Sequence, residues 1–233
     1  NWETFDEFVA RIGKNVDINV APLVGHSVLR MWVMGDESMK RTATMSETLA
    51  MCALLDQCLQ AVAIGLSTSF VDMDERLQPV PSRYANTEEL DALCGELSKH
   101  NKILQVVHEF YDTDLTLARI DQLADISLAH GINTTLSPLF VSHDNAEGAQ
   151  QIMQRVSEHT ARGARVWPQV QTRPIDISFN FSVPSLLFIR LPKWYALMRF
   201  NTPEQIIARL KEADTRATLV AEAQGMMSLW NRL

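Results

Sequence analysis

Polar side chains that could do chemistry follow the ends of short apolar runs in this sequence of 233 residues. His26 follows an apolar run and a glycine, Ser67 closes a second run, and His108 follows a third. Arg173 comes shortly after a further run near residue 170. Imidazole nitrogens bind metal ions or transfer protons near neutral pH, hydroxyl groups form hydrogen bonds, and a guanidinium group binds a carboxylate through two parallel hydrogen bonds. These four residues are therefore the candidate site residues.

The two histidines have different predicted roles. We predict that His108 is a metal ligand, because a histidine at a strand end presents a neutral nitrogen to an ion such as Zn²⁺. A zinc site needs three or four ligands, and the residue pattern indicates only this one. We predict that His26 binds substrate, with a ligand, a general base, an oxyanion donor and a structural histidine bonded to a neighbouring loop as the alternatives.

The remaining candidates are assigned to substrate binding. Ser67 lies at the end of its run, and Arg173 is predicted to hold a substrate carboxylate, with a salt bridge at the protein surface as the alternative. The patterns H-x-H, H-E-x-x-H and G-x-S-x-G do not occur in the sequence. The catalytic residues therefore stay unassigned.

The elements that must position these residues alternate between short β-branched runs and amphipathic helices. The expected strands are 16–24, 63–67, 103–107, 132–136 and 165–170, and the expected helices are 44–59, 87–99, 115–130 and 144–162. This alternation predicts right-handed β-α-β units on a parallel sheet, whose carboxyl ends would bring the candidates to one edge. A doubly wound sheet and a barrel share this pattern, but no glycine-rich nucleotide loop follows the first run. Since five units cannot close a barrel of eight, the pattern suits a partial (β/α)8 TIM barrel.

The composition of the chain argues against some classes of binding partner. The formal charge of −7 argues against nucleic-acid binding, and no apolar run approaches the ~18 residues that cross a membrane. Three scattered cysteines fit small buried residues in a reducing, cytoplasmic protein. The start and end read as structured, so we expect an interior part of a longer chain. Residues 1–173 are predicted to form barrel units, and 174–233, rich in proline and aromatic residues, a helical insertion or lid.

Several motifs resemble one enzyme family. The run NVAPLVGHSVLR at 19–30, followed by Val33-Met34-Gly35, is similar to the "NVA-LVGH-x-x-LR-x-x-VMG" segment of D-aminoacylase-like members of the amidohydrolase superfamily. The runs AIGLSTS at 63–69 and PVPSRYA at 79–85, with Glu88-Glu89-Leu90 behind, resemble further segments of the N-acyl-D-amino-acid deacylase group. The resemblance extends over roughly residues 1 to 223, with the motifs in the same order.

The resemblance implies a zinc-dependent (β/α)8 barrel of the metal-dependent hydrolase type that hydrolyses the amide bond of small N-acyl-D-amino acids. This chain would span about the third to the seventh strand and be inactive alone, because the H-x-H motif and the catalytic aspartate of the family lie outside it. His108 falls where the family has a metal-binding histidine. The next strand should bring another, but the sequence there is Leu136-Ser137-Pro138-Leu139. The alternative is an amidohydrolase-fold protein with an altered or lost metal site that acts on another amide or only binds ligands; homo-oligomerisation is left open.

Overall fold

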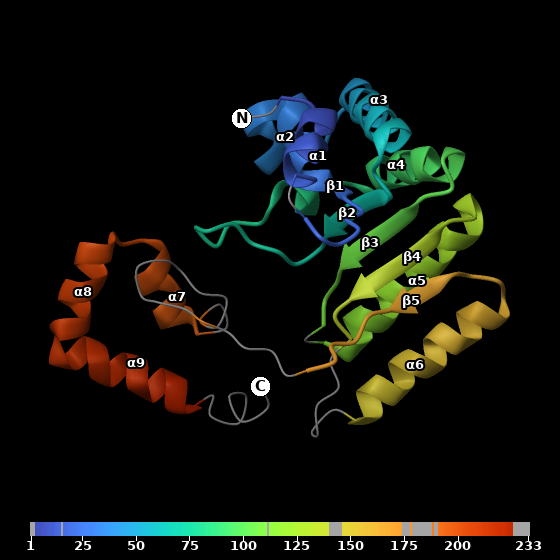
Figure 1. The fold of residues 1–233 in the computed structure, drawn as a ribbon. Coiled ribbons are helices and arrows are strands. Elements are labelled where there is room, and N and C mark those ends of the chain that lie inside the picture. Colours follow the sequence, from blue (N-terminus) through green and yellow to red (C-terminus); the bar gives the residue numbers. More distant parts are fainter. Residues whose placement is uncertain are drawn as a thin grey trace. The chain divides into compact units, whose positions relative to one another are not determined.

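A five-stranded parallel sheet runs through the first part of the chain, in the order β1-β2-β3-β4-β5 (Figure 1). The strands are β1 (Leu23–Gly25), β2 (Gly65–Ser69), β3 (Ile103–Val107), β4 (Asn133–Ser137) and β5 (Val166–Pro168). Each strand pairs with its neighbour in sequence, as in a barrel wall, whereas a doubly wound sheet reverses its strand order at a switch point. The sequential order therefore favours the barrel interpretation.

The computed structural model describes residues 3–14, 16–110, 112–139, 146–173, 178, 188 and 191–225. The chain divides into two units. The first comprises residues 1–72, 80–140 and 147–171, and the second comprises 73–79, 141–146 and 172–233. Among the described residues, no helix is both long and apolar enough to cross a membrane.

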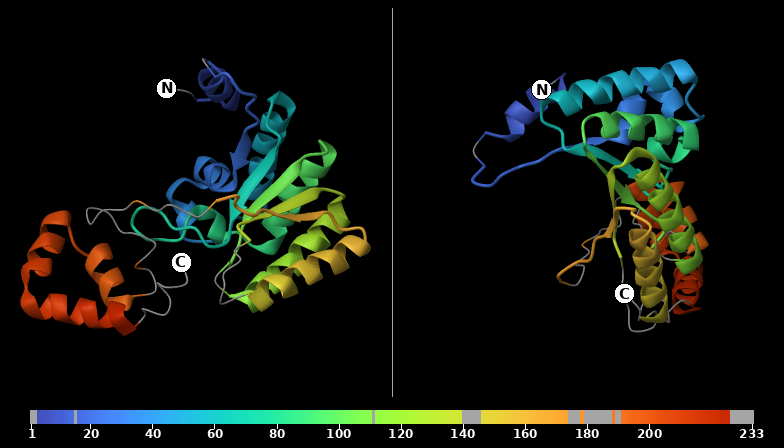
Figure 2. Two further views of the ribbon diagram at one scale, coloured as in Figure 1. Left: turned by 60° about the horizontal axis from the view of Figure 1, so that its bottom comes forward. Right: turned by 90° about the vertical axis from the view of Figure 1, so that its right-hand side faces the viewer.

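Helices cover one face of the sheet in the first unit (Figures 1 and 2). They are α2 (His26–Met34), α3 (Met45–Ala61), α4 (Thr87–Lys99), α5 (Thr113–His130) and α6 (Ala146–Ala161), with α1 (Phe5–Ile12) packed on α3 and the short 3-10 helices η1 (Gly35–Met39) and η2 (Pro81–Tyr84) between them. A single helical layer outside a parallel sheet is the arrangement of a barrel wall.

Local signals explain the helix boundaries. Thr44 and Glu47 form a capping box at the start of α3, near where the sequence predicts the helix to begin. Asn86, rather than the expected Thr87, caps α4, and its side chain accepts a hydrogen bond from the amide of Glu89. Gly131 ends α5 in the left-handed conformation, with a φ of 64°, as predicted.

One predicted strand is wrong over most of its length. The sequence predicts a strand at 16–24, but β1 contains only residues 23–25. Residues 16–20 are exposed, and the proline at position 22 has no N–H to donate to a neighbouring strand. The prediction for β2 began two residues too early, and β5 is shorter than expected.

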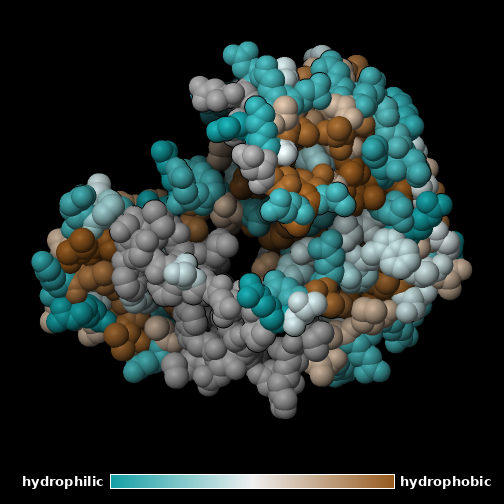
Figure 3. Space-filling view, viewed as in Figure 1, coloured by the Kyte–Doolittle hydropathy of each residue, from teal (hydrophilic) through white to brown (hydrophobic). Residues whose placement is uncertain are grey.

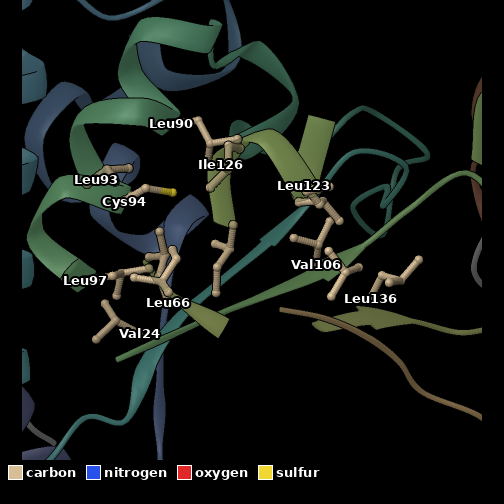
Figure 4. Close-up of a cluster of buried hydrophobic side chains, with 14 of the residues drawn as sticks. Val24, Leu66, Leu90, Leu93, Cys94, Leu97, Val106, Leu123, Ile126 and Leu136 are labelled. Atoms are coloured by element: carbon tan, nitrogen blue, oxygen red, sulfur yellow. The ribbon is translucent and has the colours of Figure 1, made fainter. Parts of the chain in front are cut away.

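Apolar side chains of the strands and helices form the core of the first unit. Leu66, Val106 and Leu136 of the strands contact buried residues of α4 and α5, which include Leu93 and Leu123 (Figure 4). Each such side chain contributes about 1.5–3 kcal/mol when fully buried. Gly65 allows β2 and β3 to approach closely, since a Cβ atom there would lie 2.1 Å from the carbonyl oxygen of Ile103. This core fixes the strand ends that carry the candidate residues.

The described residues of the second unit form three helices: α7 (Pro192–Arg199), α8 (Pro203–Lys211) and α9 (Ala213–Gly225). Phe188 stacks on Trp194 with ring centroids 4.7 Å apart, and the indole N–H of Trp194 donates to the carbonyl of Leu219. Most of 174–190 lies outside the described residues. A lid role for 174–233 stays a prediction.

Candidate functional site at the carboxyl ends of the strands

His108 directly follows β3 and is almost completely buried, with 1% of its surface exposed. Its Nε2 lies 3.1 Å from the carbonyl oxygen of Pro138, so this nitrogen carries the hydrogen and donates it. Its Nδ1 is buried and has no hydrogen-bond partner in the part of the chain that the structure describes. Burial lowers the pKa of His108 and so favours the neutral ring. The ring therefore holds an unused lone pair on Nδ1.

Glu109, next to His108, is fully engaged by Arg119 of α5. The two carboxylate oxygens accept hydrogen bonds from Nε and a terminal nitrogen of Arg119, at 3.0 and 2.6 Å. The same guanidinium group lies over the ring of Phe70, 3.6 Å from its centroid. Burial opposes ionisation of Glu109, but the hydrogen bonds from Arg119 outweigh it and the pKa of Glu109 is lowered. Glu109 is thus an ionised anchor of the segment after β3.

His26 begins α2 immediately after β1, and its exposed fraction is 1%. Its Nδ1 lies 2.9 Å from Oγ1 of Thr68 in β2, and its Nε2 lies 2.8 Å from Oε1 of Glu89 in α4. Both ring nitrogens are therefore hydrogen-bonded inside the protein. These contacts favour the structural alternative for His26, and its predicted contact with substrate stays a prediction.

Arg30 and Glu89 complete this buried cluster. Arg30 has no exposed surface; it donates one hydrogen bond to Oε2 of Glu89 and two to the main-chain carbonyls of Ser38 and Arg41, at 3.2 and 2.7 Å. Burial would raise the pKa of Glu89, but hydrogen bonds from His26 and Arg30 lower it overall. The carboxylate therefore stays ionised and joins α2 to α4.

A cavity of about 380 Å3 opens beside this cluster, near the end of β2. Polar groups on its wall come from the start of α2, from β2, from η2, from the start of α4 and from α5, and include His26, Thr68, Ser82, Arg83, Asn86 and Arg119. Arg83 donates to the carbonyl of Val71 at 3.2 Å, and Arg119 binds Glu109. His26 thus lines a cavity near the carboxyl edge of the sheet, where the sequence predicts the site.

Ser67 and Arg173 occupy different surroundings. Ser67 lies in β2, half-buried, and its hydroxyl donates to the carbonyl of Val24 at 3.4 Å. Because side chains alternate along a strand, Ser67 faces away from the side on which Leu66 and Thr68 are buried. Arg173 is exposed and belongs to the second unit. Their substrate-binding roles stay predictions.

The described residues provide one histidine suited to a metal, but not a complete metal site. His108 fits a ligand role through its unpartnered Nδ1. Within the described ranges, no group of three or more His, Cys, Asp or Glu side chains is placed to hold an ion. After β4, where the family resemblance implies a second histidine, Pro138 instead offers its carbonyl oxygen to His108. His143, five positions further along the chain than Pro138, lies outside the described residues.

Reasoning from the sequence missed the buried network of Thr68, Glu89 and Arg30. The signal was available, because Arg30 and Glu89 both stand in the motifs that resemble the family and both are charges next to apolar residues. Charged side chains that are fully buried are almost always paired. Their partnership follows from the fold, not from the spacing in the chain.

Comparison with known proteins shows which proteins this chain is similar to. No family model matches it. An N-acyl-D-aspartate deacylase of Alcaligenes xylosoxydans xylosoxydans is 41% identical over 108 residues, which cover 46% of this chain and 20% of the relative. A D-aminoacylase of the same organism is 40% identical over 37% of this chain and 16% of the relative. An N-acyl-D-glutamate deacylase of that organism is 32% identical over 52% and 22%. The matched regions thus span about a fifth of the length of these relatives.

Solved structures agree on the fold. A crystal structure of D-aminoacylase, described as defining a novel subset of amidohydrolases, aligns with a TM-score of 0.59 at 24% identity over 74% of this chain and 34% of that chain. N-acyl-D-glutamate deacylase from Bordetella bronchiseptica, in complex with zinc and a phosphonate inhibitor, aligns with a TM-score of 0.60 at 23% identity over 73% and 34%. A further D-aminoacylase structure is described as having a binuclear metal center. The predicted family resemblance is confirmed, and so is the α/β fold as part of the amidohydrolase fold of D-aminoacylase.

Proposed function

We propose that this chain, a relative of N-acyl-D-aspartate deacylase and D-aminoacylase, is the central part of a metal-dependent hydrolase that cleaves the amide bond of N-acyl-D-amino acids. One observation supports the metal-dependent chemistry in this proposal. The buried Nδ1 of His108 has no hydrogen-bond partner among the described residues, at the strand end where the family resemblance implies a metal ligand. A buried nitrogen without a hydrogen bond costs about 1–3 kcal/mol unless something else binds it.

The surroundings of His108 suit a zinc ligand. The hydrogen bond from Nε2 to the carbonyl of Pro138 fixes the tautomer and the ring orientation, which is the support that metal-binding histidines usually have. The lowered pKa keeps the ring neutral and its lone pair available. When bound, zinc would polarise the amide carbonyl and lower the pKa of a water molecule. The proposal requires further ligands outside the described residues, because these residues do not provide a complete set.

Substrate binding is assigned to residues outside the metal shell. Arg173 is exposed, and its guanidinium group would pair with the carboxylate that every N-acyl amino acid carries. Ser67, on the face of β2 that points away from the helices, would donate or accept a hydrogen bond from the amide. His26 would contribute the ring edge that lines the cavity beside β2. These three roles separate recognition of the substrate from its hydrolysis.

The full protein is proposed to be a closed (β/α)8 barrel in the cytoplasm. The five parallel strands lie in the order in which they occur in the sequence, and this order supports a closed barrel. In a (β/α)8 barrel, strands are added in sequence order until the last one pairs with the first. The cysteines Cys52, Cys58 and Cys94 are all free, which fits a reducing compartment.

A second candidate function follows from Pro138. This residue occupies the position after β4 where the resemblance implies a second histidine, and proline cannot bind a metal through its side chain. The alternative is an amidohydrolase-fold protein that has lost or altered the metal site and acts on another amide, or only binds a ligand.

Metal analysis of the full-length protein, together with a panel of N-acyl-D- and N-acyl-L-amino acids, tests the proposal. We expect bound zinc, hydrolysis of D-substrates, and loss of zinc and activity in His108→Ala. His130→Gln is the matched control, because His130 ends α5 and its ring forms a hydrogen bond with Asp91, away from the strand ends. Absence of both metal and hydrolysis would rule out the proposal, and unchanged zinc and rate in His108→Ala would favour the second candidate.

A further inference from the structure

The segment after β3 carries His108 and then leaves the sheet to begin α5 at Thr113. A connecting segment is more mobile than the strand it follows, so its conformation depends on the contacts that its residues make. The main-chain N–H of His108 lies a long 3.4 Å from the carbonyl oxygen of Ser137, and its ring donates to the carbonyl of Pro138 at 3.1 Å. Both partners come from the end of β4. Further contacts that hold this segment are made by Glu109.

Glu109 is attached to α5 at two points. Its carboxylate accepts hydrogen bonds from Nε and a terminal nitrogen of Arg119, at 3.0 and 2.6 Å, and its main-chain carbonyl accepts one from the hydroxyl of Thr116. Two parallel hydrogen bonds fix the direction of a carboxylate as well as its distance, because the guanidinium group is planar and its donors are rigidly spaced. The side chain and the main chain of Glu109 are thus both held by the first half of α5.

The guanidinium group of Arg119 is itself fixed by two further contacts. Its Cζ lies over the ring of Phe70, 3.6 Å from the centroid, and its second terminal nitrogen donates to Gln122 on the same helix. Phe70 directly follows β2, and its amide donates to the carbonyl of Val107, the last residue of β3, at 2.9 Å. Arg119 therefore joins the ends of β2 and β3 to α5.

The pair of Arg119 and Glu109 is largely shielded from water, since the two side chains are 24% and 12% exposed. Hydrophilic residues make up much of the surface of the first unit in Figure 3, where water solvates their side chains. Ion pairs at such a surface contribute little, because water and salt screen them and both side chains lose conformational freedom. A shielded pair is screened much less. It therefore holds its geometry and can fix the position of the neighbouring residue.

Arg119 also lines the cavity near the end of β2, so contact with a substrate carboxylate is the competing role. The edge formed by Nε and one terminal nitrogen could bind a carboxylate through two hydrogen bonds, but Glu109 already occupies it. The other terminal nitrogen binds Gln122. These contacts favour a role within the protein framework over one in binding substrate.

We propose that Arg119 is a positioning residue for His108: it holds Glu109 against α5 and thereby fixes the main chain from which the His108 ring projects. The inference rests on the proposed metal-dependent function, because this ring carries the buried Nδ1 that would bind zinc. The hydrogen bond to Pro138 sets the tautomer, and the attachment of Glu109 sets the place from which the ring starts. Every contact in this series lies within the first unit. Arg119 acts through Glu109, so its effect is on the affinity for metal.

The zinc affinity of the full-length protein, measured by competition with a chromophoric chelator, tests this proposal. Arg119→Lys keeps the charge but loses the planar pair of donors, and Glu109→Gln keeps the size but loses one acceptor oxygen. Each should raise the dissociation constant for zinc about 10-fold, at the lower end of the effect of residues that support metal-binding histidines. The double variant should lose little more than either single variant, because both changes break one interaction. Circular dichroism establishes that each variant is folded.

Arg41→Lys is the matched control. Arg41 forms the same kind of pair, with two hydrogen bonds of 2.9 and 2.8 Å to Glu47, but this pair lies at the start of α3. The control should bind zinc like the wild type.

A second measurement does not need the metal. Nuclear magnetic resonance of isotopically labelled histidine rings, without added metal, reports which ring nitrogen carries the hydrogen; the signal of His108 is the one lost in His108→Gln. We expect hydrogen on Nε2 alone in the wild type and a mixture of both tautomers in Arg119→Lys.

Unchanged zinc affinity in Arg119→Lys would overturn the positioning role, and a raised KM alongside it would assign Arg119 to substrate binding. An equal loss of affinity in Arg41→Lys would also overturn it, because general destabilisation would then explain the effect. A wild type that binds no zinc would contradict the proposed function instead. The ring signal then decides the positioning role alone, and an unchanged tautomer in Arg119→Lys would refute it.

Discussion

Replacing Glu89 by glutamine tests how much the buried cluster around His26 contributes to stability. The substitution keeps the size of the side chain but removes the charge that faces Arg30 and His26. Arg30 and Glu89 have no exposed side-chain surface, so water cannot replace the lost carboxylate. Leaving one partner of a buried pair uncompensated costs about 3–5 kcal/mol. Two main-chain hydrogen bonds to Arg30 remain, so we expect a loss near the lower end, ~3 kcal/mol.

Urea unfolding followed by circular dichroism measures this loss. Glu88→Gln is the matched control, because Glu88 is the exposed neighbour in the same helix turn, and its free energy of unfolding should stay within ~0.5 kcal/mol of the wild type. The double variant Arg30→Met, Glu89→Leu removes both charges, and it should be more stable than Glu89→Gln alone. A loss below ~1 kcal/mol in Glu89→Gln would refute the reasoning, since it would mean that Arg30 does not depend on the carboxylate.

Two further predictions concern pH and backbone packing. The pKa of Glu89 is lowered in the folded protein, so its stabilising effect is present above the unfolded value near 4.5 and is lost as the pH falls through the folded value. The difference in free energy of unfolding between the wild type and Glu89→Gln should therefore shrink as the pH falls below about 5. Urea unfolding midpoints of both proteins, measured at each pH, give this difference. Gly65→Ala should destabilise by at least ~2 kcal/mol, because its Cβ would lie 2.1 Å from the carbonyl of Ile103. Gly95→Ala in α4 has open space and should stabilise by about 0.5–1 kcal/mol; the opposite order of the two midpoints would contradict the packing argument.

Helices were the elements that the sequence predicted best. The range of α4 is as predicted, and α5 ends at Gly131 as expected. Their signals are local: capping side chains, helical spacing of apolar residues and a glycine at the end act within a few positions. Strand limits depend on the neighbouring strand. Residues 16–20 therefore resemble a strand in composition, but no described strand pairs with them and they lie exposed.

The candidate site shows the same division. The sequence placed His26, Ser67 and His108 at the ends of successive apolar runs. Parallel pairing of β1, β2 and β3 brings His26 and His108 to one edge of the sheet, whereas Ser67 lies in the middle of β2, which continues to Ser69. Their surroundings came from distant segments. The carbonyl of Pro138, thirty residues along the chain, is the partner that leaves Nδ1 of His108 with its lone pair.

The sequence by itself determined the residue types along the strands, the range of α4, the end of α5 and the family resemblance, because each of these is encoded over short stretches of chain. It did not predict α2, which begins at His26. Only the tertiary structure decided the strand order and the burial of Arg30 and Glu89. It also placed both nitrogens of His26 in hydrogen bonds with Thr68 and Glu89, which lie 42 and 63 positions away. Hydrogen bonding and burial depend on distance in space, and the pairing of strands and helices sets that distance.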